Sequence, residues 1–336
     1  MRPSFYPRLI NEPFNDPGLF IPLFFEKRVI LFDLGDIYSL SPRDILKISH
    51  VFISHMHMDH FVGFDRLLRL FLGREKILYL YGPEGLFKNV EGKLAGYEWN
   101  LVRNFLNRFV LHVTEVHHAN LFVRQYRCQN RFRPPPNTLK EPFDGILHDE
   151  PAFSVSAVIL DHSIPCLGFT IKERFHVNIK KDDVSDLGLA IGPWLKQFKQ
   201  ALFNHKDPNS EFEVKFPGIK SEKKKYILGD LANRIALITP GQKVTYITDV
   251  VYNTSNVKKI VLFAQDADHL FIEAAFLEKD RAIARKKFHL TARQAGSIAK
   301  KAGVKQFTLF HFSPRYMDQA HLLQQEARKA FENKEI

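Results

Sequence analysis

Residues 50–60 have the sequence HVFISHMHMDH, in which a short apolar run is followed at once by a dense group of metal-binding side chains. The apolar run predicts a buried strand, and the pattern His-x-His-x-Asp-His places His55, His57, Asp59 and His60 directly after it. Side chains at positions i and i+2 of a strand end point the same way, so His55 and His57 can bind one ion. Asp59 and His60, in the turn that follows, can bind a second. Imidazole suits zinc, and a carboxylate helps to bind or select another divalent ion.

Short apolar strands that end in a polar residue recur along the rest of the chain. Three of these predicted strands are followed by His162, Asp249 and His311, and a fourth by Glu273. In layered α/β folds, functional sites form at the ends of strands. Because one motif cannot fill two coordination spheres, we expect His162, Asp249 and His311 to be the further metal ligands.

Helices are expected between the strands. Residues 41–47 begin with Ser-Pro, which is typical of a helix N-cap followed by proline at the first helical position. Residues 61–72 have apolar side chains at helical spacing. Near the C-terminus, Thr291 and Gln294 have the spacing of a capping box, and Gly303 can end the helix that they begin.

Composition places the chain among ordinary globular proteins with an excess of positive charge. The 336 residues are 45% hydrophobic, which excludes a disordered, fibrous or disulfide-stapled protein. The formal net charge is +11, which favours a polyanionic partner such as nucleic acid, although a generally basic surface explains it equally well. With only Cys128 and Cys166, no signal-like N-terminus and no apolar run long enough to span a bilayer, we expect a cytoplasmic protein.

Residues 172–225 interrupt the alternation of strands and helices. They contain 12 Lys and Arg against 8 Asp and Glu, and we interpret them as an inserted basic arm rather than a second domain. Lys196 and Lys199 in this arm are candidates for contacts to a nucleic-acid backbone. A second unusual segment, residues 131–137, contains three consecutive prolines and predicts a stiff surface loop.

The order of these motifs resembles the metallo-β-lactamase superfamily. The resemblance implies an α/β fold, a four-layer αβ/βα sandwich formed by one domain over residues 1–336, with the arm inserted at 172–225. It also implies that two divalent ions, zinc or manganese, are bound, and that Asp33 supports the ligands from behind. In that arrangement, one ion is held by His55, His57 and His162, the other by Asp59, His60 and His311, and Asp249 bridges them.

Further segments are similar to the ribonuclease Z family within that superfamily. These segments are residues 161–169, 188–196, 272–276, 289–295 and 311–316. The resemblance implies an endonuclease that removes the 3′ trailer from precursor tRNA by two-metal hydrolysis, acting as a homodimer whose arm binds the RNA.

The same resemblance suggests how the leaving ribose oxygen is protonated. His289, oriented by Glu273, is the candidate general acid, because histidine titrates near neutral pH and a carboxylate can hold its tautomer. Asp59 completes the expected catalytic group, and Arg315 is a candidate to bind a phosphate oxygen.

A small-molecule hydrolase on the same fold remains the alternative. Such an enzyme would cleave a cyclic nucleotide or another ester, and it is favoured by residues 82–146, which are hard to align with the ribonuclease Z pattern.

Overall fold

The computed structural model describes residues 5–24, 26–215 and 223–332. The chain divides into two compact units. The main unit contains residues 5–147, 155–171 and everything from 243 onward, and the small unit contains residues 148–154 and 172–242. None of the helices in the described part of the chain is long and apolar enough to cross a membrane.

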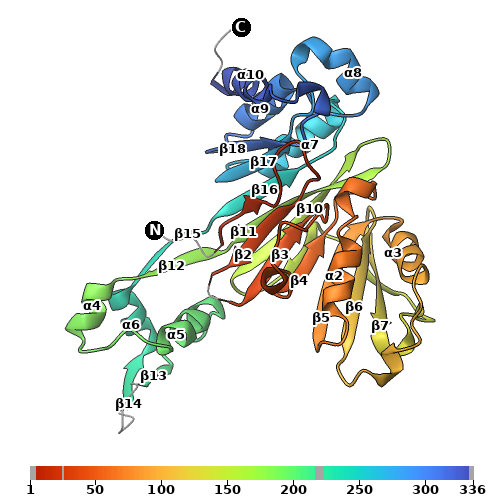
Figure 1. Ribbon diagram of the computed structural model, residues 1–336. Coiled ribbons are helices and arrows are strands. Elements are labelled where there is room, and N and C mark those ends of the chain that lie inside the picture. Colours follow the sequence, from red (N-terminus) through yellow and green to blue (C-terminus); the bar gives the residue numbers. More distant parts are fainter. Residues whose placement is uncertain (1–4, 25, 216–222, 333–336) are drawn as a thin grey trace. The chain divides into compact units, whose positions relative to one another are not determined.

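The first sheet of the main unit has eight strands in sequence order (Figure 1). Strands β3 to β6 are parallel, and the outer strands pair antiparallel, so the sheet is mixed. The strands are β1 (Arg8–Leu9), β2 (Leu19–Leu23), β3 (Arg28–Phe32), β4 (Ile48–Phe52), β5 (Lys76–Pro83), β6 (Phe109–Val116), β7 (Asn120–Arg127) and β8 (Leu139–Pro142).

The second sheet has six strands in the order β18-β17-β16-β11-β10-β9. Strands β16, β17 and β18 run parallel, so the residues that follow all three lie at the same edge. The strands are β9 (Ile146–Asp149), β10 (Phe153–Asp161), β11 (Pro165–Glu173), β16 (Lys243–Ile247), β17 (His269–Glu273) and β18 (Phe307–Phe310).

Aromatic side chains join the facing surfaces of the two sheets. The ring centroid of Phe169 on β11 lies 5.2 Å from that of Phe32 on β3 and 5.7 Å from that of Phe52 on β4. The Leu167 amide of β11 donates to the Ser54 carbonyl at 2.8 Å. These contacts lie directly beneath the histidine motif, so the two sheets are held together where the motif begins.

Helices flank both sheets, as the sandwich prediction requires. The buried apolar face of α2 packs into the core of the first sheet, α3 contacts β5 and β6, α7 contacts β16, and α9 contacts β17 and lies beside α10 (Figure 1). The helices are α1 (Pro42–Ile45), α2 (Phe64–Phe71), α3 (Leu86–Ala95), α7 (Thr254–Ala264), α8 (Arg281–Lys286), α9 (Ala292–Lys301) and α10 (Ala320–Glu332). The predicted architecture of two sheets with flanking helices is confirmed.

Local signals in the sequence place the helix ends well. The Ser41 side chain accepts from the Asp44 amide and Pro42 begins α1. Thr291 and Gln294 form the predicted capping box at the start of α9, and Gly303 follows that helix with φ +64°. The helix expected over 61–72 starts only at Phe64, because the preceding residues belong to the turn of the histidine motif.

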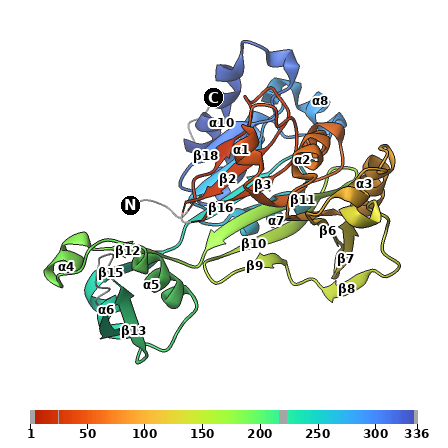
Figure 2. The same ribbon diagram turned by 60° about the horizontal axis from the view of Figure 1, so that its bottom comes forward.

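The small unit is formed by its own strands and helices (Figure 2). Its apolar core includes Trp194, Phe198 and Phe212. Strand β12 pairs antiparallel with β15, and β13 with β14. The predicted arm falls within this unit, which continues beyond its expected end to Gln242, while residues 216–222 of the arm lie outside the described residues. The elements are β12 (Phe175–Ile179), α4 (Lys181–Asp186), α5 (Trp194–Phe203), β13 (Glu211–Lys215), β14 (Lys223–Ile227), α6 (Leu228–Ile235) and β15 (Ala236–Pro240).

Candidate metal centre

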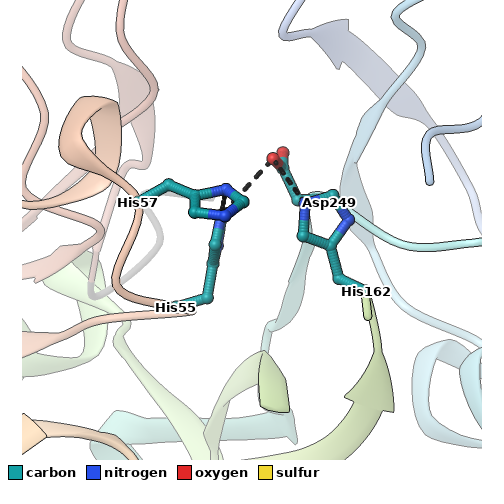
Figure 3. Close-up of side chains that lie close together, drawn as sticks. All are labelled: His55, His57, His162 and Asp249. Carbon is teal, nitrogen blue, oxygen red and sulfur yellow. Dashed lines mark hydrogen bonds and ion pairs between the residues drawn. The ribbon is translucent and has the colours of Figure 1, made fainter. Parts of the chain in front are cut away.

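His55 and His57 lie in the loop after β4, not at the end of a strand. Strand β4 ends at Phe52, so the alternation of strand side chains does not bring the two histidines together, and the expected reason for their pairing is wrong. They meet nevertheless, because the loop turns into a short 3₁₀ helix, Met58–His60. His55 Nε2 lies 2.9 Å from His57 Nδ1 (Figure 3).

The ligand residues predicted from sequence form adjoining clusters in the main unit. Within each cluster, the candidate ligand atoms lie within 4.8 Å of one another. One cluster contains His55, His57, His162 and Asp249, a second contains Asp59, His60 and His311, and a third contains Asp249, Glu273, His289 and His311.

Asp249 lies between the first two clusters. Its Oδ2 atom is 3.5 Å from His55 Nε2 and 3.5 Å from His162 Nε2 (Figure 3). The same atom is 3.6 Å from His60 Nε2, and the Oδ1 atom is 3.3 Å from His311 Nδ1. A carboxylate in this position can reach an ion in either cluster.

Three residues of this region have left-handed backbone conformations. Asp33, Asp249 and His311 follow β3, β16 and β18 with φ of 60°, 37° and 61°. Aspartate and histidine adopt this conformation more readily than most residues, but it still costs free energy. Its recurrence at three strand ends that meet indicates that the chain is bent to direct these side chains inward.

Asp33 supports His60 from behind. Its Oδ2 atom lies 2.8 Å from His60 Nδ1, which leaves His60 Nε2 directed at the cluster. Asp33 also accepts from the Ser54 amide at 2.7 Å and from the Tyr246 hydroxyl at 2.9 Å. The supporting role expected for Asp33 therefore matches its contacts, whereas Tyr246 carried no signal in the sequence.

Two glycines allow the His60 turn to approach the loop after β3. A Cβ atom on Gly35 would lie 2.6 Å from the Asp59 carbonyl oxygen, and one on Gly63 would lie 2.3 Å from the Gly35 carbonyl oxygen. Backbone hydrogen bonds join the same segments, from the Leu34 amide to the His60 carbonyl and from the Gly63 amide to the Leu34 carbonyl, both at 3.0 Å.

His162 is oriented by a backbone carbonyl. Its Nδ1 atom lies 2.9 Å from the Phe288 carbonyl oxygen, which accepts the Nδ1 proton and leaves Nε2 free to act as a ligand. Burial lowers the pKa of His162, and burial together with the nearby His60 charge lowers the pKa of His55 to about 2. Both rings are therefore neutral, which is the form that binds metals.

The charges and the unpartnered atoms of the clusters fit a cation. Burial favours the neutral form of Asp249, but His311 and His60 outweigh it and hold the pKa of this carboxyl well below its usual range. His60 Nε2 and His311 Nδ1 are buried and have no hydrogen-bond partner among the described residues. Buried polar atoms normally have partners, so these nitrogens, together with carboxylates at the same point, suit divalent metal ions.

His289 and Glu273 form a pair beside the clusters. Glu273 is fully buried, its Oε1 atom accepts from the Val250 amide at 2.7 Å, and its Oε2 atom lies 3.0 Å from His289 Nδ1. Burial disfavours the charged imidazole, but the charge of Glu273 and its hydrogen bond outweigh it and raise the pKa of His289 to about 9. His289 therefore carries a proton at neutral pH and is mostly buried, as a proton donor should be.

A cavity of about 280 Å³ opens next to these residues. Asp59, His289 and His311 line it, and Phe14, Asp16, Phe276, Lys287 and Phe312 are among the other lining residues. Sequence reasoning missed Lys287 and the contribution of the N-terminal segment. Lys287 lies two positions before His289, and that proximity was the one available signal.

The predicted substrate-binding residues are not among the residues that line this cavity. Arg315 does not line the cavity, and its guanidinium lies 4.0 Å from an Asp280 carboxylate oxygen. Lys196 and Lys199 belong to α5 of the small unit, where Lys196 is exposed and burial lowers the pKa of Lys199. Their contacts to a substrate stay predictions.

Comparisons of sequence identify related proteins. A sequence profile of the beta-lactamase superfamily domain matches residues 229–312. The chain is 30% identical over 319 residues to ribonuclease Z of Geobacillus kaustophilus. This alignment covers 91% of this chain and 85% of the relative. It is 26% identical over 315 residues to ribonuclease Z of Deinococcus radiodurans, with 92% and 90% of the two chains covered.

Solved structures share the same fold. Human tRNase Z, short form, aligns with a TM-score of 0.50 and 18% identity over 94% of this chain and 93% of that one. Yeast PDE1 aligns with a TM-score of 0.55 and 9% identity over 98% and 93% of the two chains. At these identities the likeness concerns the fold alone.

Proposed function

Because the chain belongs to the ribonuclease Z family of the metallo-β-lactamase superfamily and is a metal-dependent hydrolase, we propose that it removes the 3′ trailer from precursor tRNA. The observation that carries this proposal is the His289–Glu273 pair, with Nδ1 and Oε2 3.0 Å apart, beside the Asp249-centred clusters. Cleavage of RNA by water releases a ribose oxygen that needs a proton, and a positioned acid at this point supplies it.

The proposed centre binds two divalent ions, zinc or manganese. His55, His57 and His162 would hold one, Asp59, His60 and His311 the other, and Asp249 would bridge them. When bound, such a pair of ions supplies Lewis-acid activation of water and of the scissile phosphate.

The chain's own side chains do the remaining work. Asp33 and the Phe288 carbonyl hold His60 and His162 in the ligand orientation. Glu273 keeps His289 protonated and holds its ring toward the cavity, where it can give its proton to the leaving oxygen. Asp59 and His311, 3.2 Å apart, form part of the cavity wall on the same side.

Lys287 would bind a phosphate of the RNA at the mouth of the cavity. Lys287 lines the same cavity as His289, and phosphate contacts by lysine position a nucleic acid without reading its sequence. Arg315 lies four residues after His311. It is proposed to give up its weak contact to Asp280 and to bind a neighbouring phosphate instead.

The small unit is proposed to serve as the RNA-binding arm. Exposed Lys196 would contact the RNA backbone, with Lys199 as a less accessible neighbour. We further propose that the protein acts as a homodimer in the cytoplasm, where its two free cysteines, Cys128 and Cys166, would stay reduced.

The test is cleavage of a 3′-labelled precursor tRNA beside cleavage of bis(p-nitrophenyl) phosphate, a small phosphodiester. The proposal predicts a cut directly after the discriminator base in wild type and its loss in Asp249→Ala. Turnover of the small ester without any cut in the precursor would contradict the tRNA substrate and support the small-molecule alternative.

A further inference from the structure

A second cavity lies at the end of β7 in the main unit, far from the histidine clusters. Its volume is about 450 Å³, which is within the range of small-molecule sites. The end of β7 forms one side, and the loop with three consecutive prolines forms the other. The lining residues are Gln125, Arg127, Gln129, Asn130, Arg131, Arg133, Pro134, Pro135 and Pro136.

Three arginines line this cavity without a compensating carboxylate. No acidic side chain belongs to the lining, and no ion pair reaches Arg127, Arg131 or Arg133 in the described part of the chain. Arg131 Nε is buried and has no hydrogen-bond partner there. Like charges that converge in a concave site repel one another and create a positive potential, which favours an anion.

Neutral side chains hold Arg127 in place. The side-chain Oε1 atom of Gln125 accepts from Arg127 Nη2 at 2.8 Å and from Nε at 3.1 Å, and Gln125 Nε2 lies 2.9 Å from His112 Nε2. Burial lowers the pKa of His112, and the positive charge of Arg127 adds to that effect. These contacts fix the direction of the Arg127 guanidinium but leave its charge unbalanced.

The opposite wall is rigid. Arg131 and Phe132 both have positive φ, at 54° and 53°, and the strain is offset by the burial of Phe132. The Phe132 ring packs edge-on against Trp99, with centroids 4.8 Å apart, and against Phe109 at 5.8 Å. The following prolines restrict the backbone further, so little conformational entropy remains to be lost when a ligand binds.

We propose that Arg127, Arg131 and Arg133 bind the phosphate of a nucleotide-sized ligand at a site separate from the metal centre. Guanidinium groups match phosphate geometry. The Asn130 side-chain amide and the Gln129 Oε1 atom offer hydrogen-bonding groups of the kind that base edges require, while Gln129 Nε2 donates to the Asn107 carbonyl at 3.0 Å. The ligand is either a nucleotide of an RNA chain or a free nucleotide, since both present the same group.

The site is distinct from the metal centre on the sheet. Strand β7 is three positions from β4 in the first sheet, which corresponds to about 14 Å across neighbouring strands. Arg127 pairs with Val110 at the beginning of β6, whereas the histidine motif follows the end of β4. One small ligand cannot occupy both sites.

The experiment compares the full-length, ion-loaded wild-type protein with two cavity variants. One combines Arg127→Gln and Arg133→Gln, and the other is Arg131→Asn, chosen because asparagine tolerates positive φ. Arg43→Gln combined with Arg69→Gln is the matched control, because both residues are exposed and line none of the described cavities. Adenosine 5′-monophosphate and a short single-stranded oligoribonucleotide are the two probes, titrated by calorimetry.

The proposal predicts that at least one probe binds about tenfold more weakly to the cavity variants than to the control, with no fall in the thermal unfolding temperature. Weakening confined to adenosine 5′-monophosphate assigns a free nucleotide, and weakening of the oligoribonucleotide assigns RNA. If neither probe binds, or if both bind the cavity variants and the control equally, the proposal is wrong.

Discussion

Replacing Glu273 by glutamine tests the role of the buried pair most sharply. The change keeps the side-chain shape and the carbonyl oxygen that accepts from Val250, and it removes one negative charge 3.0 Å from His289. The pKa of His289 is raised to about 9 because Glu273 outweighs burial. With the carboxylate gone, Asp249 is the remaining negative charge that raises the pKa of His289, and burial and the His60 charge oppose it, so the pKa should fall and a smaller share of the ring should be protonated near pH 7.5.

The structure sets the size of two effects. General acid catalysis contributes roughly 10²- to 10⁴-fold, so kcat for precursor tRNA should fall by about 10² or more at pH 7.5 while KM changes little. A pKa raised from 6.5 to about 9 corresponds to roughly 3 kcal/mol of folding free energy in the ion-free protein. Because the folded-state pKa is the higher one, this stability is fully present below pH 6.5 and is lost as the pH rises through about 9.

The assay combines a pH–rate profile with urea unfolding of the ion-free protein at pH 6 and above pH 9. Glu115→Gln is the control, since Glu115 is a buried glutamate on β6 that accepts from the Gly85 and Phe87 amides. In the pH–rate profile of Glu273→Gln, the fall in rate on the alkaline side should begin at a lower pH than in wild type. The ion content of the variant should be unchanged. An unshifted profile, or an equal loss in the control, would refute the assignment of His289 as the proton donor.

Three further predictions follow from the contacts around the metal centre. Tyr246→Phe should weaken metal binding by roughly 10- to 100-fold, because it removes a hydrogen bond to Asp33. Unchanged affinity in a competitive zinc titration would show that Tyr246 does not support the metal ligands through Asp33. Gly63→Ala should destabilise the protein by about 1–3 kcal/mol in urea unfolding, since the added methyl would meet the Gly35 carbonyl oxygen at 2.3 Å. An unchanged free energy of unfolding would show that the two loops separate easily. Lys287→Ala should raise KM for precursor tRNA at low salt and reduce the salt dependence of binding, and an effect on kcat alone would argue against a phosphate contact.

Much of the fold was predictable because its signals are local. Apolar runs of strand length overlap β4, β10, β16, β17 and β18. The polar residues that follow β16, β17 and β18 lie at one edge of the second sheet, as parallel strands require. The caps of α1 and α9 were readable because their hydrogen bonds join residues three positions apart.

The parts that escaped prediction depend on contacts between distant segments. Tyr246 reaches Asp33 across 213 residues and the Phe288 carbonyl reaches His162 across 126, so neither leaves a pattern in the sequence. The loop course of His55 and His57 depends on the packing of the turn against the β3 loop rather than on strand alternation. The small unit continues to Gln242 because β15 pairs with β12, and no local signal in the sequence predicts that pairing.

We propose that the clusters joined by Asp249 bind a pair of divalent ions. Metal content is measured by mass spectrometry after zinc loading and dialysis, for wild type and Asp249→Asn, with Asp161→Asn as a control at an exposed carboxylate that precedes His162 in the sequence. We predict close to two ions per chain in wild type and in the control, and fewer than one in Asp249→Asn. Two ions retained by Asp249→Asn, or none bound by wild type, would contradict the account.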